Sequence, residues 1–192
     1  HPASWQRVLL TELEKNSTLR LHVVVLRKQF ERDLTFERNG VTFHLVKTPG
    51  GLRAPSLFWV DTVMIRRVLC TVQPDIVHAW GTEQGAALVA KRLGYPRVVT
   101  IQGLMTWYGQ IVPQAWAERL AGMIERYSLP RSPVVTTECR FSSQWLRQRY
   151  PRVRVEQRRL DNHLDKWHPG LRCVPTAWVP STHPDYAMSV EI

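Results

Sequence analysis

Apolar runs separated by polar and turn residues predict a series of strands along the chain. Residues 19–26 are apolar and β-branched enough for a strand that is buried on both faces of a sheet. Residues 34–38 and 41–46 flank Asn39-Gly40, the dipeptide most typical of a two-residue hairpin, so two antiparallel strands are expected there. Further strands are predicted at residues 75–79, 98–101, 133–137 and 153–157.

Between these runs, apolar residues return at the three- and four-residue spacing of helices. Ser4 can cap a first helix, in which Trp5, Val8, Leu9 and Leu13 recur at helical spacing. This helix should end near Asn16. Pro55 can occupy the first turn of a second helix. Its predicted apolar face holds Leu57, Val60, Met64, Val68 and Val72. A later helix has a predicted apolar face of Trp116, Leu120, Met123, Ile124 and Tyr127. Because strands and helices alternate, the pattern favours an α/β fold with a mainly parallel, Rossmann-like sheet flanked by helices.

Residues 74–103 form the predicted centre of this fold, as a strand, a helix and a second strand. Gly81 ends the first apolar run, Thr82 is placed to cap the helix, and Glu83 puts negative charge at the positive end of the helix. The two strands should be parallel, and the crossover between them should be right-handed.

The carboxyl ends of these two strands are the place where open parallel sheets bind ligands. This rule brings together a candidate site of Trp80, Gly81, Thr82, Glu83, Gln102 and Gly103. His78 lies near the end of the first strand, where a general base or a contact to a sugar hydroxyl would be useful. The alternative is a purely structural unit, in which His78 is packed, Glu83 is a partner of the helix dipole and the other residues form turns.

The formal net charge of +10 is concentrated late in the chain. The arginines there are Arg131, Arg140, Arg147, Arg149, Arg152, Arg154, Arg158 and Arg159. A basic face of this kind could meet nucleic acid, an anionic bilayer or a phosphorylated ligand, and a solvated surface is the alternative for any single arginine. We expect residues 140–159, which include Trp145, to bind anionic vesicles weakly, and we expect no nucleic-acid partner.

The chain offers few residues for metal or cofactor chemistry. Cys70, Cys139 and Cys173 are odd in number and lack metal-ligand spacing, which indicates a reducing compartment and no metal site. No P-loop or dinucleotide-binding fingerprint is present, and no apolar run approaches the length of a transmembrane span. Residues 1–157 are predicted to form one domain. Prolines break the pattern in residues 158–192, which are predicted to be an irregular tail or the truncated start of a further domain.

Residues 75–83 and 96–103 carry motifs that resemble the amino-terminal half of GT-B glycosyltransferases of the retaining, family-four type. They read DIVHAWGTE and PRVVTIQG, where the family has D-V-V-H-x-H-G and P-V-V-x-T-x-H-G. The similarity also covers the first helix, the strand at residues 134–137 with the Ser142-led helix after it, and, weakly, residues 162–169. It spans about residues 3–169, without the first strand and Gly-rich loop of the family.

This resemblance implies an enzyme, a glycosyltransferase of the hexosyltransferase type. This half would hold a glycan, lipid or small-molecule acceptor, and a second Rossmann-like half would bind the nucleotide-sugar donor, with no other cofactor. The family's donor-side Arg/Lys pair and E-x7-E signature have no counterpart here, so the chain is expected to be incomplete and inactive by itself. A cytoplasmic location is expected, with peripheral contact at the inner face of the membrane.

Trp80 and Gln102 stand where the family usually has His. A Gln side chain can donate and accept hydrogen bonds to hydroxyls but cannot carry a proton at neutral pH, so Gln102 is expected to position a ligand. The alternative function, from a different class, is a non-catalytic Rossmann-like binding module whose basic face docks on an anionic partner.

Overall fold

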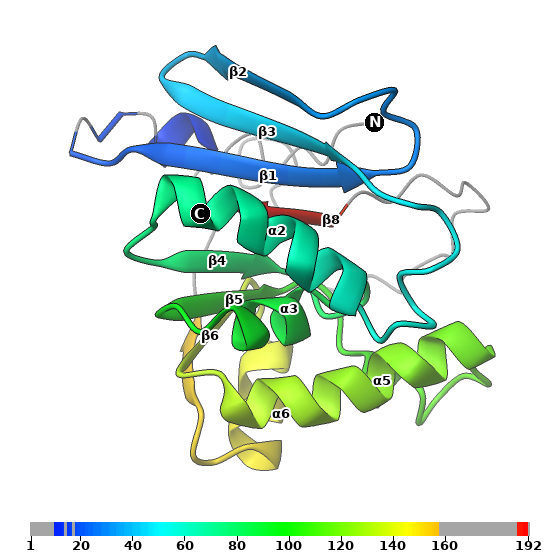
Figure 1. Ribbon diagram of the computed structural model, residues 1–192. Helices are drawn as coiled ribbons and strands as arrows, with labels where there is room; N and C mark the ends of the chain where they lie inside the picture. The colour runs from blue at the N-terminus through cyan, green and yellow to red at the C-terminus, as the bar shows by residue number, and fades with distance from the viewer. Residues whose placement is uncertain (1–9, 14, 17, 158–187, 192) are drawn as a thin grey trace, which may run out of the picture. The chain divides into compact units, whose positions relative to one another are not determined.

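The computed structural model describes residues 10–13, 15–16, 18–157 and 188–191 (Figure 1). The chain divides into two compact units, one formed by His1–Pro74 with Ala187–Ile192 and the other by Asp75–Tyr186. Residues 10–13 are helical, as predicted for the end of the first helix. The rest of that predicted helix, including Ser4, and residues 158–187 of the predicted tail lie outside the described residues.

The first unit contains four described strands. They are β1 (Leu21–Arg27), β2 (Leu34–Arg38), β3 (Val41–Lys47) and β8 (Met188–Glu191). Strand β3 pairs with β2 in antiparallel and with β1 in parallel orientation, and β1 also pairs antiparallel with β8. Asn39 and Gly40 have φ angles of 53° and 76°, the left-handed conformation that a type I′ hairpin turn requires. The predicted hairpin is therefore confirmed, whereas β8 falls where the sequence predicts no strand.

Helix α2 (Trp59–Val72) begins later than the sequence predicts and turns a different face inward. Leu57 and Phe58 have φ angles of 47° and 61°, which are incompatible with a right-handed helix, so Pro55 lies in the turn before α2. Ile65 and Leu69 are fully buried, and the helix packs against β1. The predicted apolar face is wrong, because Leu57 is exposed and the others are half-buried: Val60, Met64, Val68 and Val72.

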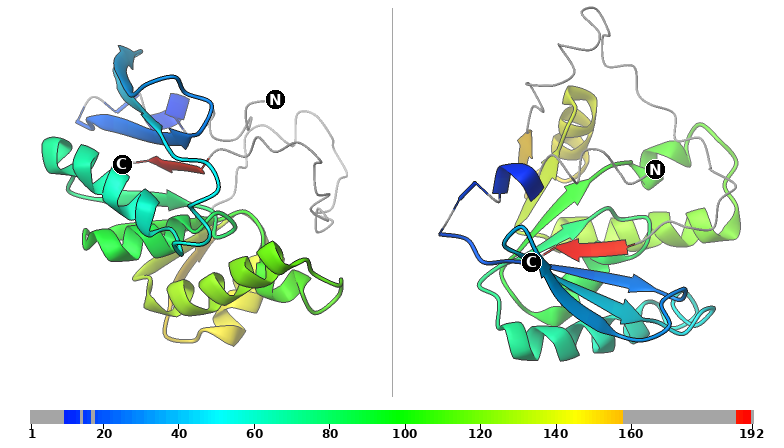
Figure 2. Two further views of the ribbon diagram at one scale, coloured as in Figure 1. Left: turned by 45° about the vertical axis from the view of Figure 1, so that its right-hand side comes forward. Right: turned by 90° about the horizontal axis from the view of Figure 1, so that it is seen from above.

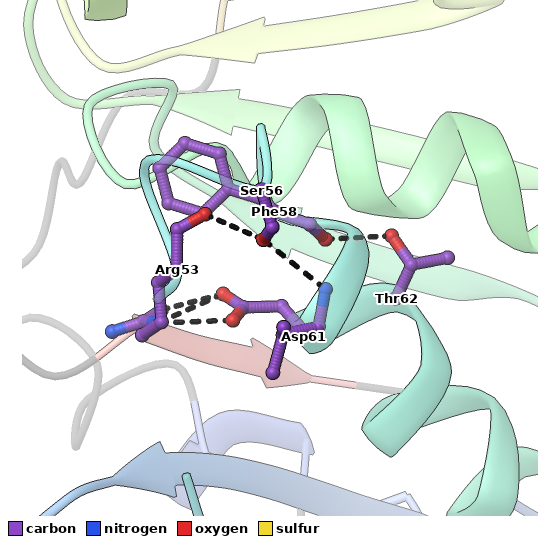
Figure 3. Close-up of polar contacts among 6 residues, drawn as sticks. Arg53, Ser56, Phe58, Asp61 and Thr62 are labelled. Atoms are coloured by element: carbon purple, nitrogen blue, oxygen red, sulfur yellow. Dashed lines mark hydrogen bonds and ion pairs between the residues drawn. The ribbon is translucent and has the colours of Figure 1, made fainter. Parts of the chain in front are cut away.

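A buried ion pair fixes the turn before α2 (Figure 3). Arg53 Nε donates to Asp61 Oδ1 at 3.0 Å and to Oδ2 at 2.9 Å, and Arg53 Nη2 donates to Oδ2 at 2.8 Å. The hydroxyl of Ser56 donates to the carbonyl of Arg53, and that of Thr62 donates to the carbonyl of Phe58, both at 2.9 Å. These contacts offset the cost of the left-handed backbone, about 1–2 kcal/mol per residue.

The second unit is a four-stranded, all-parallel sheet flanked by helices (Figure 1). Its strands are β4 (Val77–Trp80), β5 (Arg97–Ile101), β6 (Val134–Thr137) and β7 (Arg154–Gln157), paired in that order. Its helices are α3 (Ala86–Leu93), α4 (Met105–Tyr108), α5 (Trp116–Ser128), the 3-10 helix η1 (Leu129–Arg131) and α6 (Arg140–Arg149). The strand order advances in one direction, so right-handed crossovers place α3, α5 and α6 on the same face. The predicted α/β, Rossmann-like fold is confirmed.

The two faces of this sheet differ in chemistry, because successive strand residues point to opposite faces. One face carries an apolar set that is almost entirely buried: Val77, Ala79, Val99, Ile101 and Val135. The opposite face carries polar side chains at paired positions, since Trp80 pairs with Thr100 and Thr100 pairs with Thr136. The core of the unit therefore lies between the apolar face and the helices.

Helix α5 forms where the helical spacing predicts a helix, but it does not bury the predicted apolar face. Of the five residues of its predicted apolar face, Ile124 is buried, whereas Trp116, Met123 and Tyr127 are 69%, 59% and 45% exposed. The buried side of α5 instead carries small residues and one carboxylate: Ala121, Gly122, Glu125 and Ser128. The reason is that Glu125 accepts buried hydrogen bonds from Thr82, Met105 and Thr106, which fix the rotation of the helix about its axis.

Candidate functional site

The carboxyl ends of β4 and β5 are joined by backbone and side-chain hydrogen bonds. The N–H of Gly81, just beyond β4, donates to the carbonyl of Thr100 on β5 at 2.8 Å. Gly81 has a φ angle of +76°, which glycine adopts readily and other residues do not. The structure thus brings together the two sequence segments that the predicted site combines.

The Glu83 carboxylate links the segment after β4 to the segment after β5 by accepting a backbone hydrogen bond from each, and we call this pair of hydrogen bonds the Glu83 clasp. Its Oε2 accepts from the N–H of Thr82 at 2.9 Å, and its carboxylate also accepts from the N–H of Gly103. A Cβ atom at Gly81 would collide with Oε2 of Glu83, and one at Gly103 would lie 3.1 Å from Oε1. Glycine at both positions thus leaves room for the Glu83 carboxylate, which a side chain at either position would displace.

The predicted cap of helix α3 is wrong. The helix begins at Ala86, its N-cap residue is Gly85, and no side chain caps it. Thr82 lies too far before the helix, and its hydroxyl donates to Glu125 instead. The Glu83 carboxylate accepts from the N–H of Thr82 and does not lie in the first turn of α3. The turn from Thr82 to Gly85, closed by a 3.1 Å backbone hydrogen bond, displaces the helix start.

Burial raises the pKa of Glu83 above its ordinary value of 4.5, and the negative charge of Glu125 acts in the same direction. The backbone N–H donors of Glu83 itself, Thr82 and Gly103 oppose this shift, because they stabilise the carboxylate. The net result is that the folded protein binds a proton at Glu83 more readily than the unfolded chain does.

Replacing Glu83 with Gln is expected to remove part of the pH dependence of stability. With a raised folded-state pKa, the stabilising contribution of Glu83 is complete below the unfolded-state pKa and is lost as pH rises through the folded-state pKa. The free energy of unfolding of the wild type minus that of Glu83→Gln should therefore fall as pH rises from 4.5. Urea denaturation at stepped pH measures this difference, with exposed Glu156→Gln as control. A difference that does not change with pH would contradict the assignment.

A second carboxylate, Glu125 of α5, lies fully buried beneath the site. Its Oε2 accepts from the hydroxyl of Thr82 and from the N–H of Met105, both at 2.9 Å. Its Oε1 accepts from the N–H of Thr106 at 3.0 Å and from the Thr106 hydroxyl. Glu125 therefore holds the segments that follow β4 and β5 in place. Sequence reasoning missed it, although small residues at Ala121, Gly122 and Ser128 mark the side of α5 that packs closely.

His78 and Trp80 belong to a chain of polar contacts on the polar face of the sheet, which continues through Thr100 to Thr136 and which we call the polar ladder. The Nε1 of Trp80 donates to Nε2 of His78 at 2.9 Å, and the same nitrogen of His78 lies 2.6 Å from Oγ1 of Thr100. The Thr100 hydroxyl in turn lies 2.5 Å from that of Thr136. This ladder joins β4, β5 and β6, so His78 and Trp80 act between strands in the structure and are separate from the clasp at the strand ends.

Gln102 follows β5 directly, and its side chain is exposed at the carboxyl edge of the sheet. Ile101 pairs with Thr137, so Gln102 and Glu138, the next residue on each chain segment, lie at the same edge. Glu138 is exposed too, and sequence reasoning missed it although it follows a predicted strand. The Gln102 amide and the Glu138 carboxylate at this edge offer hydrogen-bond donors and acceptors of the kind that recognise hydroxyl groups.

The described part of the chain holds neither a metal site nor a membrane span. There, no group of three or more His, Cys, Asp or Glu side chains is arranged to hold a metal ion. Within the same described residues, no helix is long and apolar enough to cross a membrane. Cys70 and Cys139 are free thiols, and Cys173 lies outside the described residues.

Comparison with known families assigns the chain to a family. No curated protein matches the chain significantly. The family model described as Glycosyltransferase Family 4 matches residues 7–159, which include the clasp, the polar ladder and the strand ends that carry Gln102 and Glu138. Because this match covers well over half of the chain and agrees with its Rossmann-like parallel sheet, the chain belongs to glycosyltransferase family 4.

Proposed function

We propose that the chain is the acceptor-side half of a retaining GT-B glycosyltransferase of the hexosyltransferase type. It would hold a glycan, lipid or small-molecule acceptor while a second Rossmann-like domain binds a nucleotide-sugar donor. The proposal rests on the family match together with one observation of geometry. This observation is that the Glu83 clasp joins the ends of β4 and β5 and leaves Gln102 exposed beside Gly103.

The residues of the predicted site divide into two groups under this proposal. Thr82 and Glu83 have their side chains in hydrogen bonds that shape the edge, and His78 and Trp80 are joined to the ladder on the sheet face. These residues would position the backbone without touching the acceptor. Contact with acceptor hydroxyls would fall to Gln102, the backbone at Gly103 and the carboxylate of Glu138.

Transfer would also need groups that neutralise the diphosphate leaving group, because enzymes usually gain most of their rate by stabilising the charge that develops in the transition state. We propose that the donor-binding domain supplies them, so the 192-residue chain would not turn over a nucleotide-sugar by itself. We also propose a cytoplasmic location, with peripheral contact at the inner face of the membrane, where anionic lipids would attract a chain of net charge +10.

Replacing Gln102 with Ala is expected to slow transfer roughly tenfold in an enzyme that joins this chain to a donor-binding domain, because one directed hydrogen bond to the acceptor is lost. The pH dependence of the rate should not change, since an amide does not titrate. Gln102→His, which restores the usual residue of the family, should retain or raise activity. Steady-state kinetics on the matched control Gln144→Ala, an exposed Gln of α6, should equal the wild type. Wild-type kinetics for Gln102→Ala would make Gln102 a turn residue only.

A further inference from the structure

One side of α5 carries large apolar side chains in solvent, although their spacing is typical of a buried helix face. Trp116, Met123 and Tyr127 are exposed along this side, and Leu120 between them is half-buried. The loop before α5 adds two consecutive exposed aliphatic residues, Ile111 and Val112. Figure 2 shows this loop at the amino-terminal end of α5. We call these five exposed residues the α5 strip.

Basic side chains flank the α5 strip. Arg119 and Arg126 are exposed on the same helix, each about one helical turn after Trp116 or Met123. At the other end, Lys91 donates to the hydroxyl of Tyr127 at 3.2 Å, and the guanidinium of Arg131 lies 4.2 Å from the centre of the Tyr127 ring. The exposed apolar surface is therefore bordered by positive charge along its length.

The acidic residues of α5 do not offset this charge on the exposed side. Glu125 is fully buried on the opposite side of the helix, where it accepts hydrogen bonds from Thr82, Met105 and Thr106. Glu118 turns back to accept from the N–H of Ala115 at 2.8 Å. An anionic surface could thus approach the α5 strip without meeting a carboxylate of this helix on its exposed face.

Aromatic and aliphatic side chains on one helical face, bordered by Arg and Lys, are the composition of helices that lie in the interface of an anionic bilayer. Trp and Tyr rings favour the headgroup region, and the long stems of Arg and Lys let their charges reach lipid phosphates while the apolar side chains enter the acyl boundary. We propose that the α5 strip docks the second unit on an anionic membrane surface. This proposal rests on the membrane contact of the proposed function and names the surface that would make it, but it is independent of the acceptor site, because the α5 strip and the carboxyl edge use different residues.

The proposed docking surface differs from the basic segment at residues 140–159, which the sequence predicts to bind vesicles. In its described residues, that segment has one large apolar side chain in solvent, Phe141 at 38% exposure, whereas Trp116 and Met123 are 69% and 59% exposed. Arginine alone gives attraction that salt screens, while inserted apolar area keeps a protein bound. Membrane attachment should therefore depend more on the α5 strip than on Arg140 or Arg152.

Co-flotation of the 192-residue chain with vesicles tests the proposal. Vesicles of phosphatidylcholine mixed with phosphatidylglycerol should bind the chain, and vesicles of phosphatidylcholine alone should bind it less. The double variant Trp116→Ser/Met123→Ser should lower the partition coefficient on anionic vesicles at least about tenfold. Arg126→Glu should lower binding to anionic vesicles only. The matched control Trp59→Ser removes another exposed Trp, on α2 in the other unit, and should leave binding unchanged.

All replaced side chains are exposed, so circular dichroism should show the same fold for each variant. The proposal is overturned if the folded wild type does not float with anionic vesicles, or if the double variant floats like the wild type. It is also overturned if Arg140→Glu or Arg152→Glu abolishes flotation while the double variant does not. A concentration-dependent dimer in the absence of lipid that the double variant abolishes would overturn it too, because the α5 strip would then be an interface between copies of the chain.

Discussion

Glu125→Ala is expected to lower the free energy of unfolding by about 3–5 kcal/mol. The carboxylate accepts from the hydroxyls of Thr82 and Thr106 and from the backbone N–H groups of Met105 and Thr106. All of these groups are buried, so removing their acceptor leaves buried donors without partners, each at a cost of about 1–3 kcal/mol. The segments after β4 and β5 would lose their common anchor.

Urea denaturation followed by circular dichroism measures this loss. Glu125→Gln keeps one acceptor oxygen but turns an NH₂ group toward backbone donors, so its loss should be smaller than that of Glu125→Ala. The control is Glu156→Ala, which breaks an exposed pair with Arg154 and should cost less than about 1 kcal/mol. If Glu125→Ala is no more destabilising than this control, the hydrogen bonds of Glu125 do not hold the site.

Arg53→Ala is expected to destabilise the first unit by about 3 kcal/mol, because it leaves a fully buried carboxylate without its charged partner. The guanidinium of Arg53 makes three hydrogen bonds to Asp61, and the backbone carbonyl of Arg53 accepts from the hydroxyl of Ser56 (Figure 3). Arg53 therefore supports the strained turn at Leu57 and Phe58 as well as the first turn of α2. Arg67→Ala, which removes an exposed Arg of the same helix, is the matched control and should change stability little.

The double variant Arg53→Met/Asp61→Leu separates the pair's own contribution from the cost of an unpaired charge. Replacing both members of a buried ion pair with apolar side chains is often close to neutral, whereas removing one member is not. The double variant should therefore be more stable than Arg53→Ala in chemical denaturation. Equal losses for the two variants would mean that Arg53 acts through its other contacts and not through Asp61.

Local patterns were sufficient to predict most of the strands and the fold class. The hairpin at Asn39-Gly40 depends on two left-handed residues that only a few residue types adopt, and the parallel pair β4 and β5 follows from an apolar run, a helix and a second apolar run. Both features therefore depend on residues that lie close together in the sequence. The prediction that the strand ends Trp80-Gly81 and Gln102-Gly103 meet is likewise confirmed by the Gly81 hydrogen bond to Thr100.

The orientations of α2 and α5 could not be predicted in the same way, because partners distant in sequence determine them. On α5, the spacing of Trp116, Met123 and Tyr127 is that of a buried stripe, yet the four hydrogen bonds to Glu125 turn the opposite side inward. A buried carboxylate looks like a surface residue in a sequence until its donors are known. Thr82 is a further example, because the sequence predicts that it caps α3, whereas its hydroxyl donates to the distant Glu125.

The carboxyl edge of the second unit is the centre of the functional proposal, and sugar binding by the chain tests it most directly. Saturation-transfer difference NMR with a panel of oligosaccharides, glycolipid headgroups and nucleotide-sugars is the measurement. We expect the folded chain to bind an acceptor sugar and not the nucleotide-sugars, and we expect Gln102→Ala to weaken this binding roughly tenfold while Gln144→Ala leaves it unchanged. Binding of no member of the panel, or sugar binding that is the same in Gln102→Ala and in the wild type, would contradict an acceptor site at this edge.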